Sequence, residues 1–321
     1  MTTIASAPGK IILFGEHAVV YGKPAIAAAI TLRTRVKAEK TDGNKVMITS
    51  FPLKKRETVL TQEIVEETRV SPLAYCFSAV KQAYQLAGFE KGLKIEISSS
   101  IPPDSGLGSS AAVSVAVLAA TLGELGLNLE KEKLAKVATQ VERDVQGVSS
   151  GLDPTTSSHG GFLYYKQGEI IQLGAGEELR LVTGYSGQKS STKKQVELVK
   201  ARLEEYPDII GPTIETIGRI VDRGREALEK GETARVGRLM VMNQWCLELL
   251  GVSTPKLRRL VGAALEAGAE GAKITGAGGG GSIIALALRS EQKVQKAIEK
   301  AGGAPLSVGI DKTGVQVSKI G

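Results

Sequence analysis

The sequence predicts an α+β protein built from two domains or lobes. Its 321 residues exceed what one hydrophobic core usually supports, since cores stop growing at about 250–300 residues. Strand-like and helix-like segments alternate through the first half, and the second half is mostly helical before it returns to strand character. We expect an N-terminal domain over residues 1–170 and a C-terminal domain over residues 171–321, with the boundary inside 165–180.

The first half supplies most of the expected strands. Residues 10–14, 25–36 and 93–97 are rich in β-branched or alternating apolar residues, which is typical of strands. Two helices follow. Residues 109–126 are rich in Ala, Val and Leu and should be buried, whereas residues 130–145 place their apolar side chains at helical spacing on one face.

The second half begins and ends with strand character. Its expected strands are residues 162–165, 179–182, 282–288 and 314–317. Between them the chain should form successive amphipathic helices. We expect these helices to be separated at Pro207, Gly211-Pro212, Gly231 and Gly251.

The charge of the chain does not by itself indicate a partner. The formal net charge is +7, and a basic surface can attract nucleic acid, acidic lipid or a polyanionic nucleotide. Basic residues interleaved with aromatics, or a motif that reads bases, would favour nucleic acid, and neither is present. The densest basic run, residues 189–194, is of a kind that usually forms solvated surface.

Cysteines and histidines argue against a zinc site. Cys76 and Cys246 lie far apart in the sequence, as do His17 and His159, so no pair has metal-ligand spacing. Free thiols among apolar residues suit a reducing compartment. The sequence starts without the charged and apolar segments of a signal peptide, and no stretch reaches the ~18 apolar residues of a membrane span. We therefore expect a cytoplasmic protein.

A glycine-rich loop between an expected strand and an expected helix predicts a phosphate site. Free N–H groups and the positive end of the helix converge there, an arrangement that binds anions. The loop is not a P-loop, because no Lys-Ser or Lys-Thr pair follows its glycines, and it lacks the three-glycine spacing of a dinucleotide fingerprint. The residues expected to bind the nucleotide are Pro103, Asp104, Ser105, Gly106, Leu107, Gly108, Ser109, Ser110, Ala111 and Ala112.

Two further stretches carry glycines. Residues 276–281 contain five glycines, and ordering so many of them is entropically expensive. We expect this stretch to approach a ligand or the first loop closely. Residues 7–22 place Lys10 at a strand start and Glu16 beside His17 near a turn, which taken alone is weak evidence for a site.

Together the three stretches resemble those of the GHMP kinases, a family of ATP-dependent small-molecule kinases. The string Pro-x-x-x-Gly-Leu-Gly-Ser-Ser-Ala-Ala over residues 102–112 is specific to that family, and the three motifs stand in its order along nearly the whole chain. Residues 15–22, Gly-Glu-His-Ala-Val-Val-Tyr-Gly, and residues 273–281 are similar to those of the members that phosphorylate mevalonate, and the length resembles their compact archaeal branch.

The resemblance implies a two-lobed GHMP kinase fold, with ATP and the acceptor meeting in the cleft between the lobes. It also implies phosphorylation of the primary hydroxyl of mevalonate, giving 5-phosphomevalonate and ADP in isoprenoid precursor biosynthesis. ATP and Mg²⁺ would be required, and relatives of this branch often form homodimers.

The resemblance also assigns roles to individual residues. Asp153 matches the family's catalytic base, and Lys10 would stand beside it as a catalytic cation. The hydroxyl of Ser110 and the carboxylate of Glu142 match the ligands of Mg²⁺. The residues that would reach the acceptor are Glu16, His17, Val145 and Thr192, and Lys189 or Lys193 beside Thr192 would help to attract its carboxylate.

Each of these residues also has a structural explanation. The first loop has the alternative of a purely structural turn, and residues 276–281 that of a flexible linker. Asp153 has the alternative of stabilising the turn before Pro154. Glu142 lies off the apolar stripe of its helix, so the pattern alone predicts a solvated charge. The alternative for His17 is a buried histidine with a purely structural role.

Rival functions remain at this point. The nearest are family members that phosphorylate phosphomevalonate, homoserine or galactose, and a member that phosphorylates a different hydroxyl of mevalonate. A rival of another class is a non-catalytic ATP-binding regulator, which loss of Lys10, Glu142 or Asp153 would have favoured. All three are present.

Overall fold

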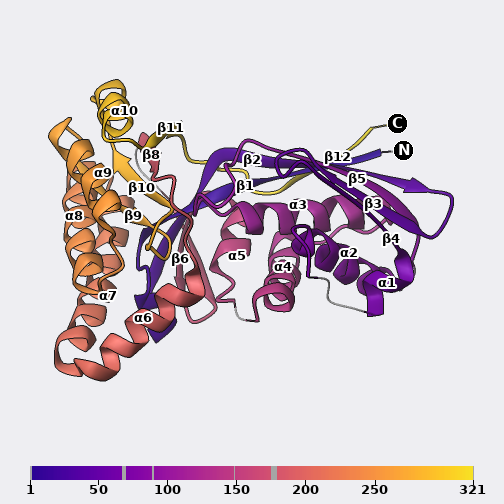
Figure 1. Ribbon diagram of the computed structural model, residues 1–321, viewed down its shortest axis with the longest axis horizontal. Coiled ribbons are helices and arrows are strands. Elements are labelled where there is room, and N and C mark those ends of the chain that lie inside the picture. The colour runs from indigo at the N-terminus through magenta and orange to yellow at the C-terminus, as the bar shows by residue number, and fades with distance from the viewer. Residues whose placement is uncertain (1, 67–69, 89, 148, 175–178, 321) are drawn as a thin grey trace.

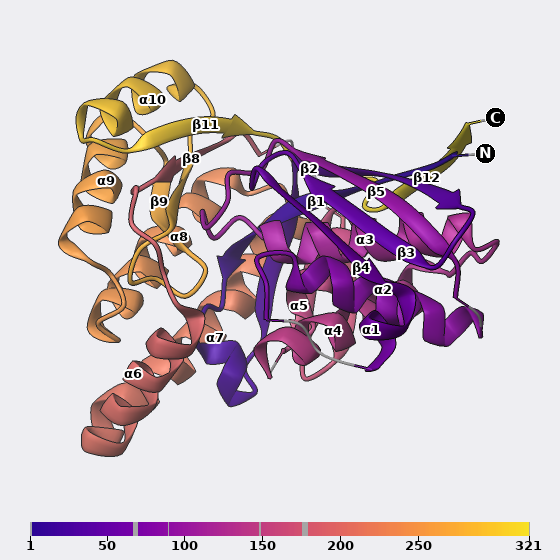
Figure 2. The same cartoon turned by 45° about the vertical axis from the view of Figure 1, so that its right-hand side comes forward.

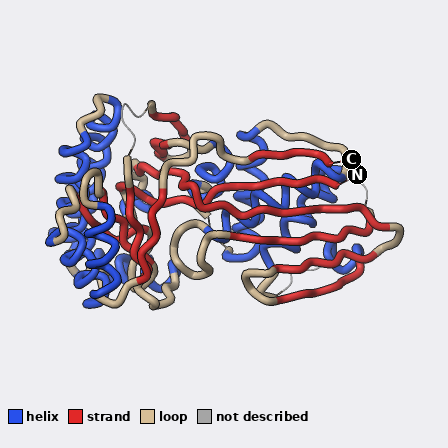
Figure 3. Tube along the Cα trace, turned by 90° about the horizontal axis from the view of Figure 1, so that it is seen from above, coloured by secondary structure: helices blue, strands red, loops and turns tan. Residues whose placement is uncertain are grey.

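The computed structural model describes residues 2–66, 70–88, 90–147, 149–174 and 179–320. The first of its two sheets has the order β12-β1-β2-β5-β3-β4, and β6 pairs with β2 and β7 with β6 (Figure 1). The strands of this sheet are β1 (Thr2–Phe14), β2 (Ala25–Thr41), β3 (Lys45–Ser50), β4 (Lys55–Leu60), β5 (Gly92–Ser99), β6 (Phe162–Lys166), β7 (Glu169–Leu173) and β12 (Gln316–Ile320). Seen from above, its long strands lie side by side over the helices (Figure 3).

Helices from the first half of the chain cover one face of this sheet (Figure 1). They are α1 (Thr61–Glu66), α2 (Ala74–Ala87), α3 (Ser109–Glu124), α4 (Lys131–Gln146) and α5 (Leu152–His159). Helix α3 packs against β1, β2, α2, α4 and α5 and is therefore buried on nearly every side. Its small residues permit this close packing: a Cβ on Gly123 would lie 2.7 Å from Cγ2 of Thr3.

The second sheet has the order β11-β8-β10-β9, all antiparallel. Its strands are β8 (Leu181–Tyr185), β9 (Gly271–Thr275), β10 (Ser282–Leu286) and β11 (Ala304–Val308). The helices of this half are α6 (Thr192–Glu205), α7 (Pro207–Glu229), α8 (Thr233–Leu249), α9 (Pro255–Glu266) and α10 (Glu291–Lys300). Strands β9 and β10 are buried at every position, and apart from Lys273 of β9 all their residues are apolar or small.

The strands β1 and β2 connect the two halves. They pair antiparallel from Thr2 opposite Glu39 to Phe14 opposite Ile26. Figure 2 shows their far ends running toward α7, and there they remain paired with each other and, through β2, with β6. There Phe14 packs so closely on α7 that a Cβ on Gly224 would lie 2.7 Å from its ring. The short 3₁₀ helix η1 (Ala18–Tyr21) follows β1 and also contacts α7.

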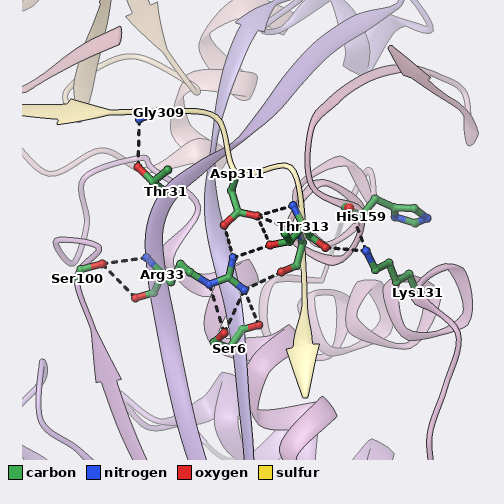
Figure 4. Close-up of polar contacts among 10 residues, drawn as sticks. Ser6, Thr31, Arg33, Ser100, Lys131, His159, Gly309, Asp311 and Thr313 are labelled. Atoms are coloured by element: carbon green, nitrogen blue, oxygen red, sulfur yellow. Dashed lines mark hydrogen bonds and ion pairs between the residues drawn. The ribbon is translucent and has the colours of Figure 1, made fainter. Parts of the chain in front are cut away.

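The last segment of the chain crosses back from the second sheet to the first. It is held by Asp311, whose carboxylate pairs with Arg33 and accepts hydrogen bonds from the N–H groups of Thr313 and Gly314, both at 2.9 Å (Figure 4). Arg33 also donates to the carbonyl oxygens of Ser6 and Gly314, at 3.0 and 2.7 Å. Strand β12 then pairs with β1, with Thr2 opposite Ile320.

Most expected elements are present, and one helix break is wrong. Residues 109–126 and 130–145 form α3 and α4 almost as predicted, while the strands expected over 10–14 and 25–36 are longer. The chain does not break at Gly211-Pro212, because α7 continues through Pro212. A proline has no N–H to donate to the carbonyl oxygen four residues earlier. Here that carbonyl belongs to Asp208, which is exposed. The division near residue 170 stays a prediction, and β12 lies in the first sheet.

No helix among the described residues is both long enough and apolar enough to cross a membrane.

The packing of α8 on β9 generates a stability prediction. Gly237 lies inside α8, and a Cβ there would sit well inside van der Waals distance of the carbonyl oxygen of Glu270. Gly237→Ala should therefore lower the free energy of unfolding by about 1–3 kcal/mol, as overpacking does. The matched control is Gly262→Ala inside α9, where nothing lies within 4 Å of the added Cβ, and helix propensity should raise stability by up to about 1 kcal/mol. Urea unfolding measures both, and equal effects would contradict the packing argument.

Candidate active site

The glycine-rich loop lies between β5 and α3, where the sequence places it. Asp104, Gly106 and Gly108 have positive φ angles of 56°, 78° and 75°, and this backbone turns the chain sharply into the helix. Gly108 caps α3 with no side-chain bond, so the first N–H groups of a 16-residue helix have no partner from within the helix. These groups and the helix dipole form an anion-binding arrangement.

The loop is fixed from two sides. On one side the N–H of Lys10 donates to the carbonyl oxygen of Leu107 at 2.9 Å, and a Cβ on Gly108 would lie 2.7 Å from Cγ of Lys10. On the other side the hydroxyl of Ser282 donates to the carbonyl oxygen of Ser105 at 2.7 Å. The loop is therefore held between β1 and the start of β10.

The glycine stretch 276–281 is ordered against this loop. A Cβ added at Gly276 would lie 3.7 Å from the carbonyl oxygen of Gly106, and a Cβ added at Gly281 would lie 3.5 Å from the carbonyl oxygen of Ser105. The expected approach of this stretch to the first loop is thus confirmed, and the linker alternative is wrong. The stretch also contacts the segment before α6, because Gly281 N–H donates to the carbonyl oxygen of Gln188 at 2.8 Å.

A cation and two carboxylates meet below the loop. The ammonium of Lys10 lies 3.0 Å from the carboxylate of Asp153, which is in the first turn of α5. Lys10 is 5% exposed and Asp153 is 31% exposed, so the pair lies at the border between interior and solvent. Asp153 therefore does more than stabilise the turn before Pro154.

Glu142 is buried in α4 rather than solvated, contrary to what its helix pattern alone suggests. Burial and the nearby charge of Asp153 raise the pKa of Glu142 to about 7. Ser149 donates its hydroxyl to Glu142 at 2.6 Å and lowers that pKa in part. Glu142 and Asp153 thus form an acidic pair that the protein's own cations compensate incompletely.

The donor set at this point fits a hard divalent cation. No group of three or more His, Cys, Asp or Glu side chains that could hold a metal occurs among the described residues. Mg²⁺ does not need one, since it is usually bound through one or two carboxylates together with substrate phosphates and waters. A buried, incompletely compensated carboxylate at Glu142 and the hydroxyl of Ser110 at the loop are oxygen donors of that kind.

Glu16 and His17 are turned inward rather than open to solvent. Glu16 is 1% exposed and forms an ion pair with Lys273 of β9, and burial raises the pKa of its carboxyl group. His17 is 5% exposed and has a positive φ of 61°. Its Nε2 atom lies 2.8 Å from the carbonyl oxygen of Ala277. Burial lowers the pKa of His17, so its ring is neutral near pH 7.

The other expected acceptor residues are Val145 and Thr192. Val145 is half-buried near the end of α4, and Thr192 is exposed as the first residue of α6. The preceding segment reaches the glycine stretch, because the hydroxyl of Ser190 donates to the carbonyl oxygen of Gly278. Lys189 pairs with Asp104 of the first loop at 2.8 Å, so its charge is directed at that loop.

Three residues of the site were not identified from the sequence. They are Tyr75, Ser149 and Lys273. The hydroxyl of Tyr75 accepts from Gln146 and hydrogen-bonds to Ser110. Lys273 stands inside the third motif, yet nothing local distinguishes it from a surface lysine. The signal that would have found it is the all-buried strand around it, in which a charge needs a partner.

The comparisons with known proteins agree with this geometry. Residues 73–161 match the GHMP kinases N terminal domain and residues 225–304 match the GHMP kinases C terminal domain. The mevalonate kinase of Pyrococcus abyssi is 46% identical, over 99% of this chain and 98% of its own length.

Solved structures give the same result. The mevalonate kinase of Methanococcus jannaschii has a TM-score of 0.87 and 31% identity, over 96% of this chain and 98% of its own. The L. major mevalonate kinase in complex with R-mevalonate has a TM-score of 0.79 and 29% identity, over 96% of this chain and 95% of its own. The full-length likeness and the matched motifs lead to one conclusion: the chain belongs to the GHMP kinase family.

Proposed function

We propose that this protein transfers the γ-phosphoryl group of ATP to the primary hydroxyl of mevalonate, giving 5-phosphomevalonate and ADP in isoprenoid precursor biosynthesis. The observation that carries this proposal is the Lys10–Asp153 pair at 3.0 Å, directly beneath an anion-binding loop at the start of α3. The relatives at 44–46% identity that cover nearly the whole chain carry the name mevalonate kinase.

The loop would bind the phosphates of ATP. Phosphoryl transfer proceeds mainly by alignment and charge neutralisation, and the backbone N–H groups of residues 106–110 supply oriented donors for that purpose. Because Lys10 and Ser282 fix the loop from both sides, little reorganisation is required when the phosphates bind.

Asp153 would act as the general base. Its carboxylate is partly exposed, so an acceptor hydroxyl can reach it and pass its proton to it as the oxygen attacks the γ-phosphorus. Lys10 would hold the Asp153 carboxylate in place, and would stabilise the charge that develops on the attacking oxygen. The bond from the γ-phosphorus to ADP breaks as the new bond forms.

Ser110 and Glu142 would hold Mg²⁺. When bound, the metal neutralises charge on the phosphate oxygens. The residues of this chain prepare that site: burial and Asp153 leave Glu142 short of positive charge, and Tyr75 hydrogen-bonds to the hydroxyl of Ser110.

Glu16, His17, Val145 and Thr192 would form the acceptor pocket. Val145 offers apolar surface and Thr192 a hydroxyl at the rim, which suits a substrate with a methyl group, a carboxylate and two hydroxyls. His17 and Glu16 are buried behind this surface, so in this state they shape the pocket rather than open into it. A homodimer and a cytoplasmic location are the remaining parts of the proposal.

The first experiment compares acceptors. ADP release should be measured with ATP, Mg²⁺ and, in turn, mevalonate, phosphomevalonate, homoserine or galactose. We expect turnover with mevalonate and at most weak turnover with the others, with the phosphate on the primary hydroxyl of the product as seen by ³¹P NMR. ATP binding without turnover of any acceptor would favour the non-catalytic regulator instead.

Asp153→Asn tests the base. Loss of a general base should reduce kcat by about 10²–10⁴-fold, while the Kd for ATP, measured by calorimetry, stays within about twofold because Asp153 does not touch the loop amides. Asp222→Asn in α7, where the aspartate only accepts from Tyr164 at 3.0 Å, is the matched control and should retain its kcat. Near-normal turnover in Asp153→Asn would remove Asp153 from the role of base.

The pKa of Glu142 predicts a pH-dependent stability of the metal-free protein. The folded value of about 7 lies above the ordinary value of 4.5, so the folded state binds this proton more tightly than the unfolded chain does. The resulting stabilisation is complete below pH 4.5 and is lost as the pH rises through 7; the two values correspond to about 3 kcal/mol. Glu142→Gln imitates the protonated acid and avoids that loss.

Urea unfolding in a metal chelator at pH 5 and pH 8 measures this effect. We expect Glu142→Gln to gain stability relative to the wild-type protein at pH 8 and to differ much less from it at pH 5. Glu299→Gln, at an exposed position of α10, should show no such change with pH. Equal stability differences for Glu142→Gln at both pH values would contradict the assignment.

A further inference from the structure

The ion pair between Lys189 and Asp104 has no part in the mechanism described so far. It joins the glycine-rich loop between β5 and α3 to the segment before α6, with 2.8 Å between nitrogen and oxygen. The side chain of Lys189 is 81% exposed and that of Asp104 is 54% exposed. Exposed ion pairs contribute little to stability, so this pair adds little to the stability of the fold.

The backbone around Lys189 is fixed against the glycine stretch 276–281. On one side of Lys189, the carbonyl oxygen of Gln188 accepts from the N–H of Gly281 at 2.8 Å. On the other side, the hydroxyl of Ser190 donates to a carbonyl oxygen of the same stretch. The main chain of Lys189 is therefore held from both sides, and its exposed side chain is the part that can move.

The glycine stretch is in turn fixed against the glycine-rich loop. Ser282, which follows the stretch directly, donates its hydroxyl to the carbonyl oxygen of Ser105 at 2.7 Å, and Asp104 is the residue before Ser105. The main chain of Lys189 thus has a fixed place beside the loop, and the ammonium at the end of its side chain is already on a residue of that loop.

The amides proposed to bind phosphate begin two residues after Asp104. Gly106 is the first of them, and two residues of chain span at most about 7 Å. An ammonium 2.8 Å from the carboxylate of Asp104 therefore lies near the place where the phosphates would bind. The flexible stem of a lysine allows its ammonium to cover a short remaining distance.

Asp104 is an anion in a loop whose backbone is suited to bind anions. Its carboxylate opposes the approach of phosphates, and the ammonium of Lys189 offsets it while no nucleotide is bound. The phosphates of ATP carry more negative charge than one carboxylate, so they compete with Asp104 for this cation. Lys10 is engaged elsewhere, because its ammonium is paired with Asp153 at 3.0 Å.

We infer that Lys189 is a nucleotide-binding residue, which exchanges Asp104 for the phosphates of ATP when the nucleotide enters the loop. This inference rests on the proposed function, because it concerns the same loop and the same nucleotide. It assigns Lys189 to the nucleotide rather than to the carboxylate of the acceptor.

The first test is Lys189→Met, with Mg²⁺ and the non-hydrolysable ATP analogue AMP-PNP as the probe in calorimetry. We expect the Kd for AMP-PNP to rise about 5- to 20-fold, because a charge-assisted contact with the phosphates is lost. Lys189→Arg keeps the charge and should stay within about threefold of the wild-type Kd. A Kd for Lys189→Met within about twofold of the wild-type value would overturn the inference.

Steady-state kinetics separates the nucleotide from the acceptor. In Lys189→Met the KM for ATP should rise by a similar factor, while kcat stays within about threefold, because the contact is made before and during transfer alike. The KM for mevalonate should stay within about twofold. A raised KM for mevalonate with an unchanged KM for ATP would assign Lys189 to the acceptor and overturn the inference.

A double-mutant cycle distinguishes phosphate binding from mere neutralisation of Asp104. Asp104→Asn should lower the Kd for AMP-PNP about 2- to 5-fold, because it removes the competing anion. Asparagine tolerates the positive φ of 56° as aspartate does. In this background Lys189→Met should still raise the Kd about fivefold or more. An increase of less than about twofold there would mean that Lys189 only offsets Asp104, and would overturn the inference.

The controls separate this inference from the proposed function. Lys136→Met in α4 removes an exposed lysine that pairs with the exposed Glu132 at 2.6 Å, and it should leave both the Kd for AMP-PNP and kcat unchanged. A wild-type protein without turnover on mevalonate would reject the proposed function, and the calorimetry would still decide the inference. An active wild-type protein whose Lys189→Met variant binds AMP-PNP equally well would reject the inference alone.

Discussion

The hydrogen bonds of Thr275 to both backbone groups of Ile12 join the two sheets at the point on which the rest of the site depends. Two residues close to Thr275 add further contacts between the halves. Lys273 forms an ion pair with Glu16, and the carbonyl oxygen of Ala277 lies 2.8 Å from Nε2 of His17. The glycine-rich loop between β5 and α3 is held between β1 and Ser282. In the folded protein, the shape of the N-terminal loop is thus fixed in part by the C-terminal sheet.

The parts that could be predicted from the sequence are those with a local cause. Glycines at a strand-to-helix turn predict the glycine-rich loop between β5 and α3. Apolar composition and spacing predict the helices α3 and α4. Both residues of the Lys273–Glu16 pair lie in motifs visible in the sequence, but their pairing could not be predicted, because they are 257 positions apart. Helix α7 continues through Pro212, and Asp208, whose carbonyl loses its usual helical partner there, is an exposed residue. Local propensity says nothing about that exposure. Glu142 shows the same limit, since its burial comes from packing rather than from its own helix.

The site concentrates charge in a chain whose net charge says little about it. Among the described residues, three acidic groups, Glu16, Glu142 and Asp153, lie near two buried cations, Lys10 and Lys273. Burial, together with the nearby charge of Asp153, raises the pKa of Glu142, and a buried carboxylate of this kind suits a divalent cation.

The return of the chain from β11 to β12 has a thermodynamic consequence. Because Asp311 and Arg33 clamp the crossing and β12 pairs with β1, the polypeptide passes between the two sheets again after both have formed. Opening of either half must break the clamp or peel away β12, which exposes the edge of the other half. The last segment is therefore a second connection between the two sheets, beside β1 and β2, and it disfavours partial unfolding of one half alone.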